Sequence, residues 1–274
     1  MNTWNKIVLG IVAIGMTAGL ATAGDANKIV VDGSTTVGPI AKAFAEYYMG
    51  QHPDVNITVS ESGSGNGAKS LINAACDVAA MSRPMKNSEM KAAKDAGVLP
   101  IEHIAAMDGI AVVVHPSNPL ANLTIEQIRD IYTGKITNWK ELGGPDRPMV
   151  AISRDTNSGT YETFETMVMN KAKMGEKVEY VGSNGAIRQR VMSTPAAIGY
   201  VGLAFTEEVK PLTVNGVEAS AETVASKEYP ISRPLYLYTN GRPKQSSPLH
   251  DFINLPDAPE GKKIVEDLGF VPSN

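Results

Sequence analysis

The chain of 274 residues has little of several features that define common protein classes. Its one cysteine, Cys76, excludes a disulfide framework and a zinc site built from thiolates. Only 6% of the residues are aromatic, and a formal charge of −4 leaves no basic excess for a nucleic-acid-binding face. The apolar fraction of 43% excludes a disordered chain and suffices for one large domain or two lobes. We expect Cys76, which lies in an apolar stretch, to be a buried small hydrophobe.

Long apolar runs are also missing, and the stretch 7–20, of about 14 residues, is shorter than the roughly 20 that a spanning helix needs. It follows Lys6 and precedes the small residues 21–23, a pattern typical of a secretory signal peptide. We predict cleavage after Ala23, which changes the charge from −4 to −5 because Lys6 is the only charged residue removed. No cysteine near this point offers a site for a lipid. We therefore expect export to a Gram-negative periplasm without a lipid anchor.

Short apolar segments alternate with amphipathic segments along the rest of the chain. Strands are expected at 28–31, 56–60, 110–114, 149–153, 198–201 and 235–238. Helices are expected at 39–49, 66–75, 124–132, 159–170 and 257–268. Thr124 followed by Gln127 has the pattern of a capping box at the start of the third helix. This alternation predicts an α/β fold with largely parallel sheets.

Three turns rich in glycine, serine and threonine each follow an expected strand and precede an expected helix, at 32–38, 60–67 and 154–161. Such turns present backbone N–H groups and hydroxyls at the positive end of a helix dipole, which suits an anion. Any one of them is explained as ordinary helix capping. Three together, one containing Arg154, indicate an oxyanion site, because the planar guanidinium is always charged and fits a tetrahedral oxyanion.

Enzyme motifs are weak or missing. Residues 63–68 match the dinucleotide pattern G-x-G-x-x-A, but no clear ribose-binding acid follows about 20 residues later. The sequence has no G-x-S-x-G elbow, no H-E-x-x-H and no P-loop, and its four histidines are scattered. We expect a protein that is not an enzyme and has no cofactor or metal.

The sequence resembles the periplasmic phosphate-binding proteins of phosphate ABC importers, the PstS family. The resemblance is carried by Gly-Ser-Thr-Thr at 33–36, Ser-Gly-Ser-Gly at 62–65, Ser-Arg-Pro at 82–84 and Arg-x-x-x-Ser-Gly-Thr at 154–160. It covers nearly all of the chain after the leader 1–23. It implies a type II periplasmic binding protein fold, with two lobes of mostly parallel sheets joined by a two-segment hinge. Lobe 1 would comprise 24–112 plus 236–274, and lobe 2 would comprise 113–235.

By position, the resemblance also implies a set of phosphate-binding residues. Hydroxyls and backbone N–H groups would come from both lobes, and the counter-charge would come from an arginine. The implied residues are Ser34, Thr35, Thr36, Ser64, Gly65, Arg154, Ser158, Gly159 and Thr160.

The loop at 80–84 departs from the family pattern, because Ser82 stands where better-known members have an aspartate. Ser82 is kept as a candidate ligand, and Arg83 is either a second cationic ligand or a solvated loop charge. Another acid must then accept the phosphate proton, and Asp108 is the first candidate, with Glu61 in reserve. The alternative for Asp108 is a structural role in capping a turn. This departure leaves sulfate, molybdate or tungstate open as ligands.

The function implied is non-enzymatic capture of inorganic phosphate between the lobes and delivery to the permease subunits of an ABC transporter. A monomer is expected. A secreted hydrolase or an adhesion or sensor module on the same fold is the alternative.

Overall fold

The computed structural model describes residues 27–273, so the predicted cleavage after Ala23 lies outside the described residues. The strands are β1 Lys28–Gly33, β2 Asn56–Ser60, β3 Val78–Met81, β4 Pro100–Val114, β5 Asn122–Leu123, β6 Val150–Arg154, β7 Glu179–Val181, β8 Ala197–Gly202, β9 Lys210–Pro211, β10 Thr213–Val214 and β11 Ser232–Asn240. The α-helices are α1 Gly38–Gln51, α2 Ser64–Ile72, α3 Asn87–Asp95, α4 Ile125–Thr133, α5 Gly159–Met167, α6 Asn184–Met192, α7 Ala221–Ala225, α8 Pro248–Ile253 and α9 Pro259–Asp267. Short 3-10 turns cover η1 Trp139–Leu142, η2 Leu203–Phe205 and η3 Leu255–Asp257.

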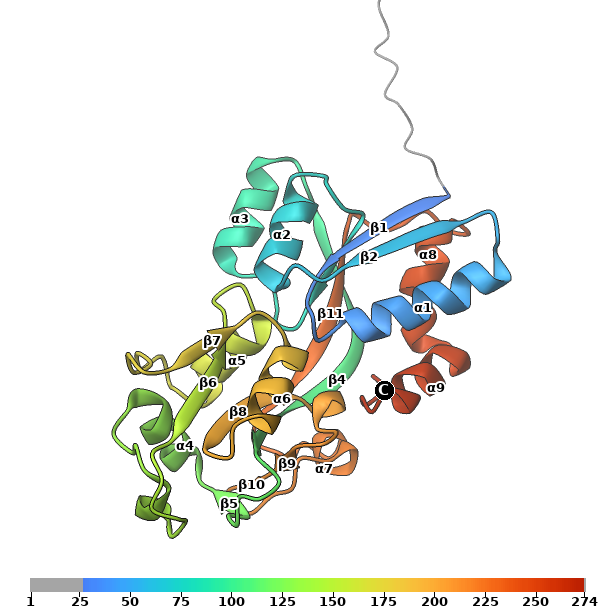
Figure 1. Cartoon of the computed structure of the whole chain (residues 1–274). Coiled ribbons are helices and arrows are strands. Elements are labelled where there is room, and N and C mark those ends of the chain that lie inside the picture. The colour runs from blue at the N-terminus through green and yellow to red at the C-terminus, as the bar shows by residue number, and fades with distance from the viewer. Residues whose placement is uncertain (1–26, 274) are drawn as a thin grey trace, which may run out of the picture.

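The strands of both lobes form one continuous path, in the order β2-β1-β3-β11-β4-β8-β6-β7 (Figure 1). At one end of this path β1 is parallel to β2 and β3, and at the other end β6 is parallel to β7 and β8. The middle is antiparallel, because β11 runs opposite to β3 and β4, and β4 runs opposite to β8. The predicted α/β fold with largely parallel sheets is confirmed, with antiparallel pairing where the lobes join.

Two strands carry the chain between the lobes. Up to Gly109, β4 pairs with β11, and from Ile110 onward it pairs with β8. The chain returns just before Ser232, where β11 begins. We use lobe 1 for residues 27–109 and 232–273, and lobe 2 for 110–231. The boundaries expected from the sequence, 112/113 and 235/236, lie a few residues further along each crossing strand and stay a prediction.

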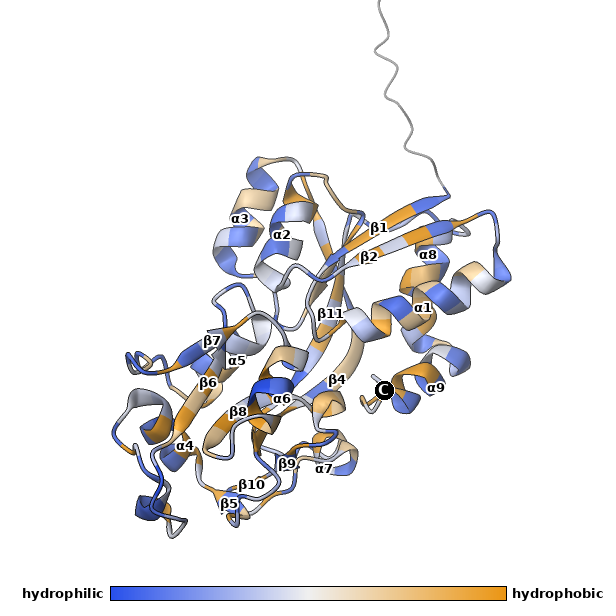
Figure 2. Ribbon diagram, viewed as in Figure 1, coloured by the Kyte–Doolittle hydropathy of each residue, from blue (hydrophilic) through white to orange (hydrophobic). Residues whose placement is uncertain are grey.

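Each lobe has its own core. In lobe 1, the apolar faces of α1, α8 and α9 cover one side of the sheet, and α2 and α3 cover the other. In lobe 2, Tyr132, Phe164 and Tyr200 form the aromatic centre, and Phe164 stacks on Tyr200 with the ring centroids 3.9 Å apart. The colouring in Figure 2 places the apolar residues on the strands and on the inner helix faces.

Two local predictions are confirmed by the structure. Thr124 Oγ1 accepts from the Gln127 backbone N–H, and Gln127 Oε1 accepts from the Thr124 N–H, which completes the capping box. Cys76 is buried, and burial raises the pKa of its thiol to about 12, so it packs as a small hydrophobe. Among residues 27–273, no helix has the length and apolarity to cross a membrane.

Candidate anion-binding site between the lobes

The three glycine–hydroxyl turns meet where the lobes face each other. The first two precede α1 and α2 in lobe 1, and the third precedes α5 in lobe 2. Thr36 Oγ1 lies 3.0 Å from Thr160 Oγ1, so the first turn contacts the third. The Gly65 N–H donates to the Asn157 carbonyl at 3.0 Å, so the second turn contacts the third as well. Segments distant in sequence thus line one small polar region.

The first turn is shaped by Ser34, whose hydroxyl accepts from the backbone N–H groups of Thr36 and Val37 at 3.1 and 3.3 Å. These hydrogen bonds hold the turn that leads into α1, as serine side chains often do for nearby backbone N–H groups. Gly33 has φ +138°, and a Cβ at this position would lie 2.1 Å from the Ala80 carbonyl oxygen. Glycine is therefore required here, and the turn directs the Thr35 hydroxyl toward lobe 2.

The second turn brings Ser64 against Ser82, at the end of β3. Their hydroxyl oxygens are 3.2 Å apart, and the Ser82 N–H donates to Ser64 Oγ at 3.0 Å. Both side chains are buried. A hydroxyl can donate and accept, so this pair can meet either a protonated or an unprotonated oxygen of an anion.

Asp32 organises the loop that leads into the second turn. Its carboxylate accepts from the hydroxyls of Ser60 and Ser62 at 2.7 Å and from Ser70 at 2.6 Å. Burial raises the pKa of Asp32, but the three hydroxyl donors outweigh burial, so the pKa lies below its usual value. The charged carboxylate therefore ties β1, the loop and α2 together beside the site.

The third turn begins α5. Ser158 Oγ accepts from the Tyr161 N–H at 3.3 Å and so caps the helix. The backbone N–H groups of Gly159 and Thr160 lie in the first turn, where the helix itself offers no acceptor. A Cβ at position 159 would lie 2.6 Å from Ser64 Oγ and 2.7 Å from Ser82 Oγ. The lobes therefore approach so closely at position 159 that only glycine fits.

Arg154 ends β6 and is 1% exposed. Its Nη2 donates to Thr35 Oγ1 at 3.1 Å and to the Gly182 carbonyl at 2.8 Å. Its Nε and Nη1 are buried and have no partner among residues 27–273. Burial lowers the pKa of Arg154 to about 10, although the charge of Asp155 opposes this change. A buried cation with two unpaired N–H groups next to helix N-termini points to an anion, since buried charged donors in folded proteins are almost always paired.

Asp108 and Arg233 form a buried ion pair on the two crossing strands. Asp108 is 0% exposed, with Oδ2 accepting from Arg233 Nη2 at 3.0 Å and Oδ1 accepting from the Leu203 N–H at 3.0 Å. Burial raises the pKa of Asp108 and lowers that of Arg233, and their mutual attraction opposes both changes. Arg233 also donates to Thr160 Oγ1 at 2.8 Å and to the Ser82 carbonyl at 2.9 Å. It thereby joins candidate ligands of both lobes to the hinge.

Two residues near the site were missed by sequence reasoning as candidate ligands. For Arg233, the sequence gives only a position near the expected lobe boundary at 235/236. Asn184, at the start of α6, donates through Nδ2 to Thr36 Oγ1 at 3.0 Å and accepts from the Gly202 N–H at 3.3 Å. Residues 182–185, Gly-Ser-Asn-Gly, form a fourth strand-to-helix turn of the same composition. That composition was the available signal for Asn184.

Arg83 and Glu61 lie differently from what the sequence suggested. Arg83 is 5% exposed, so its interpretation as a solvated loop charge is wrong. Its guanidinium is engaged by Glu89 and Glu162. Glu61 Oε1 lies 3.1 Å from Lys42 Nζ, so this carboxylate is paired with a lysine of α1.

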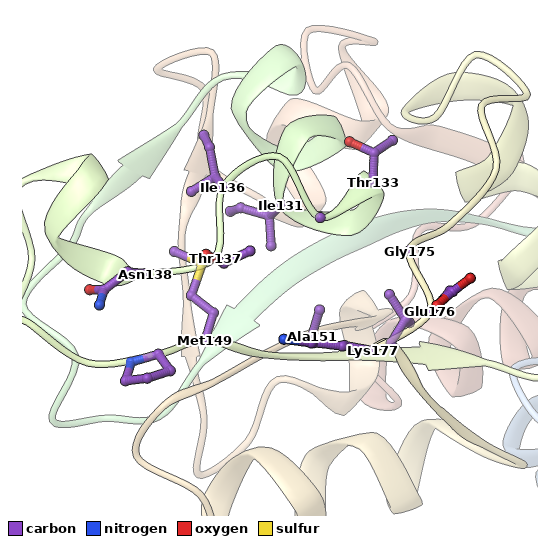
Figure 3. Close-up of a pocket in the computed structure, with 13 residues that line it drawn as sticks. Ile131, Thr133, Ile136, Thr137, Asn138, Met149, Ala151, Gly175, Glu176 and Lys177 are labelled. Atoms are coloured by element: carbon purple, nitrogen blue, oxygen red, sulfur yellow. The ribbon is translucent and has the colours of Figure 1, made fainter.

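A pocket of about 590 Å³ lies elsewhere in lobe 2, beyond the end of α4 (Figure 3). Ile131, Ile136 and Met149 form its apolar part, and Glu176 and Lys177 lie at its edge. It lacks a buried charged side chain, so it offers no counter-charge for a dehydrated anion.

Two lobes joined by two crossing strands, with hydroxyls, helix N-termini and a buried arginine facing one another, define a two-lobed binding protein for a small oxyanion. Comparisons with known proteins agree. Residues 20–255 match the family model of a PBP superfamily domain. The phosphate-binding protein PstS of Staphylococcus saprophyticus is 33% identical over 293 residues, which cover 99% of this chain and 90% of the relative.

Solved structures are similar over the same region. A Clostridium perfringens protein, assigned as a phosphate ABC transporter substrate-binding protein and solved with bound phosphate, is 37% identical with a TM-score of 0.84, over 90% of this chain and all of its own. An ABC-type phosphate transport receptor from Vibrio cholerae is 29% identical with a TM-score of 0.72, over 89% of this chain and 99% of its own. The chain belongs to the PstS family of phosphate-binding proteins.

Proposed function

We propose that this protein binds one inorganic phosphate between its lobes and delivers it to the permease subunits of an ABC importer. The observation that carries the proposal is Arg154, a buried guanidinium with two unpaired N–H groups at the meeting point of three hydroxyl-rich turns. The relatives named for phosphate binding support the same ligand.

The binding groups come from both lobes. In our proposal Arg154 supplies the positive charge through Nε and Nη1, and the N–H groups of Gly159 and Thr160 supply the helix N-terminus of lobe 2. The hydroxyls that complete the shell belong to Thr35, Thr36, Ser64, Ser82 and Thr160. Ser34 and Ser158 position these groups, because the Ser34 hydroxyl already holds the turn before α1 and the Ser158 hydroxyl already caps α5. Gly65 holds the second turn against the third, because its backbone N–H donates to the Asn157 carbonyl.

Asp108 is the candidate for telling phosphate from sulfate. Near neutral pH, phosphate keeps a proton that it can donate, whereas sulfate only accepts. We propose that Asp108 acts mainly through Arg233, because both of its oxygens already accept from Arg233 or Leu203. A direct role as proton acceptor would make the Asp108→Asn variant lose selectivity for phosphate over sulfate. A role through Arg233 would weaken the binding of both anions alike.

Titration calorimetry of the mature protein with phosphate, sulfate and molybdate, after dialysis from denaturant to remove co-purified anion, tests the proposal. We expect saturable binding of one phosphate and at least about tenfold weaker binding of the other two anions. Binding of sulfate or molybdate in preference to phosphate would assign another oxyanion. The absence of any binding would refute the proposal.

The remaining parts of the proposal concern location and chemistry. We propose a monomer exported to the periplasm after cleavage at Ala23, with no lipid anchor and no catalytic activity. Ser158, the serine of the most specific motif, has its hydroxyl committed to the Tyr161 N–H, and no histidine or carboxylate among residues 27–273 pairs with it. Mass spectrometry of the periplasmic protein and an assay with a chromogenic phosphate ester check these two points.

A further inference from the structure

A cluster of four charged residues joins the lobes beside the candidate site. Glu162 lies on α5, immediately beyond the turn that holds Gly159 and Thr160. Its Oε2 is 2.9 Å from Lys86 Nζ and 2.8 Å from Arg83 Nε. Arg83 and Lys86 belong to lobe 1, so these contacts cross between the lobes. We call Arg83, Lys86, Glu89 and Glu162 the interlobe cluster.

The lobe 1 part of the cluster is organised without help from lobe 2. Arg83 Nη1 and Nη2 donate to the two oxygens of Glu89, each at 2.7 Å. Glu89 Oε2 also accepts from the Lys86 backbone N–H at 2.8 Å, which completes the start of α3. Two cations and one carboxylate leave lobe 1 with one net positive charge at this point. Glu162 supplies the matching negative charge when the lobes meet.

The Arg83–Glu162 contact is shielded from water, whereas Lys86 is half exposed. Arg83 is 5% exposed, Glu162 13% and Glu89 16%, so solvent and salt screen the charges less than at an open surface. Burial lowers the pKa of Arg83, but the hydrogen bonds to Glu89 and the charge of Glu162 outweigh it and keep the pKa above its usual value. The Arg83 Nε–H is not aimed at Glu162, so this contact is an ion pair rather than a directed hydrogen bond.

Glu162 differs from the other polar contacts between the lobes. The contacts of Thr36, Arg154 and Arg233 involve candidate phosphate ligands, and changing them would alter the shell of the anion directly. Within the described part of the chain, the Glu162 carboxylate pairs only with Arg83 and Lys86, which have no role in the proposed shell. We therefore expect Glu162 to affect binding through the free energy of closing the lobes rather than through a contact with the anion.

We infer that Glu162 is an affinity-determining residue that stabilises the closed form and slows phosphate release without contacting the anion. The inference rests on the proposed function for its ligand, but closure can be measured with or without phosphate. A ligand that needs a closed form binds more weakly in proportion to any loss of that form. Removing the Glu162 charge should therefore weaken phosphate binding by increasing the rate at which phosphate dissociates.

The test uses a spin-label distance between introduced cysteines at Lys94→Cys in lobe 1 and Lys173→Cys in lobe 2. Both positions are exposed, and Cys76 is buried with a pKa raised to about 12, so it does not compete for the label. The Glu162→Gln variant keeps the shape of the side chain and removes its charge. Glu165→Gln is the matched control, because that carboxylate lies on the same helix and contacts Tyr161 within it.

We expect Glu162→Gln to shift the distance distribution toward the open form without phosphate, and to raise the phosphate concentration at half-closure about fivefold. Stopped-flow measurement should show that Glu162→Gln releases phosphate faster than the parent protein does. Glu165→Gln should match the parent in both the distance distribution and the release rate. If Glu162→Gln unfolds the protein, Lys86→Gln replaces it, since Lys86 is half exposed and its removal breaks one of the two interlobe contacts of Glu162 with a smaller effect of the same sign. Identical distance distributions and release rates in parent and variant would overturn the inference. Failure of the parent to bind phosphate would refute the proposed function alone, because the distances without phosphate still decide the role of Glu162.

Discussion

Replacing Arg154 with methionine should weaken phosphate binding without lowering the stability of the phosphate-free protein. Methionine fills a similar apolar volume but has no charge and no N–H group. The change removes two buried guanidinium nitrogens, Nε and Nη1, that have no hydrogen-bond partner within residues 27–273. A hydrogen bond to a charged group contributes about 1.5–3 kcal/mol, so two of them contribute at least about 3 kcal/mol. We therefore expect Arg154→Met to weaken phosphate binding by more than about a hundredfold.

The stability of the phosphate-free protein should not fall with this change. Burial lowers the pKa of Arg154 from 12.5 to about 10, so the folded state binds its proton less tightly than the unfolded chain. The shift corresponds to a penalty on the order of 3 kcal/mol, which is present at all pH values below 10 and is relieved as the pH rises through the folded pKa. Methionine removes this penalty, and the contacts of Nη2 with Thr35 and Gly182 are lost in exchange.

Calorimetry for affinity and thermal unfolding for stability separate these two effects. We expect the Tm of Arg154→Met without phosphate to equal or exceed that of the parent, and the rise in Tm that phosphate gives the parent to disappear. Arg154→Lys serves as a control, because it keeps a charge but not the planar fork, and should bind with intermediate affinity. Near-native phosphate affinity in Arg154→Met would remove Arg154 from the site and refute the reasoning. A large fall in Tm would show that the residue is mainly structural.

Two other substitutions test the turns. Gly159→Ala places a Cβ 2.6 Å from Ser64 Oγ and 2.7 Å from Ser82 Oγ, so we expect it to hold the lobes apart. Calorimetry should then show phosphate binding that is at least about tenfold weaker. Gly185→Ala is the control, because a Cβ at position 185 meets nothing closer than 3.9 Å. Unchanged affinity in Gly159→Ala would contradict the close approach of the lobes. Asp32→Asn should lower the free energy of unfolding in urea by about 1.5 kcal/mol at pH 7. Hydrogen bonds lower the pKa of Asp32 in the folded state, so this contribution is complete above the usual value of 3.8 and is lost as the pH falls through the folded pKa. The difference between parent and variant should therefore shrink as the pH falls below 3.8, and a difference that stays constant would contradict the role of the charge.

Local features of the fold were predictable because their causes are local. The alternation in 56–60 matches β2 residue for residue, and the capping box of α4 needs only Thr124 and the residue three positions later. The last helix was expected at 257–268 as one element. The structure divides this region into η3 and α9, since Pro259 cannot continue a preceding helix and instead starts a new one.

Features that depend on distant partners were not predictable in the same way. The strand β3 is only four residues long, and it is defined by pairing with β1 and β11 rather than by its own periodicity. Asp108 and Arg233 are separated by 125 positions, and only the antiparallel pairing of β4 with β11 brings them together. Arg83 illustrates the same limit, because its partner Glu162 lies on the other lobe. Sequence can suggest that such a charge matters, but only the tertiary fold identifies its counter-charge.

Arg154 and Glu162 act on lobe closure in opposite directions. Arg154 is 1% exposed in the closed form, and burying its charge without an anion disfavours that form. The interlobe cluster favours the closed form by about 1 kcal/mol, the upper range for an ion pair that is not fully buried. Because the two contributions oppose each other, we expect open and closed molecules to coexist without phosphate, in a ratio that the spin-label distances measure. An anion at Arg154 removes the opposing contribution, and the cluster then adds to the stability of the closed form. Arg154 therefore makes stable closure depend on a bound anion. Glu162 lowers the free energy needed to bring the lobes together, and so leaves more of the interaction free energy as phosphate affinity.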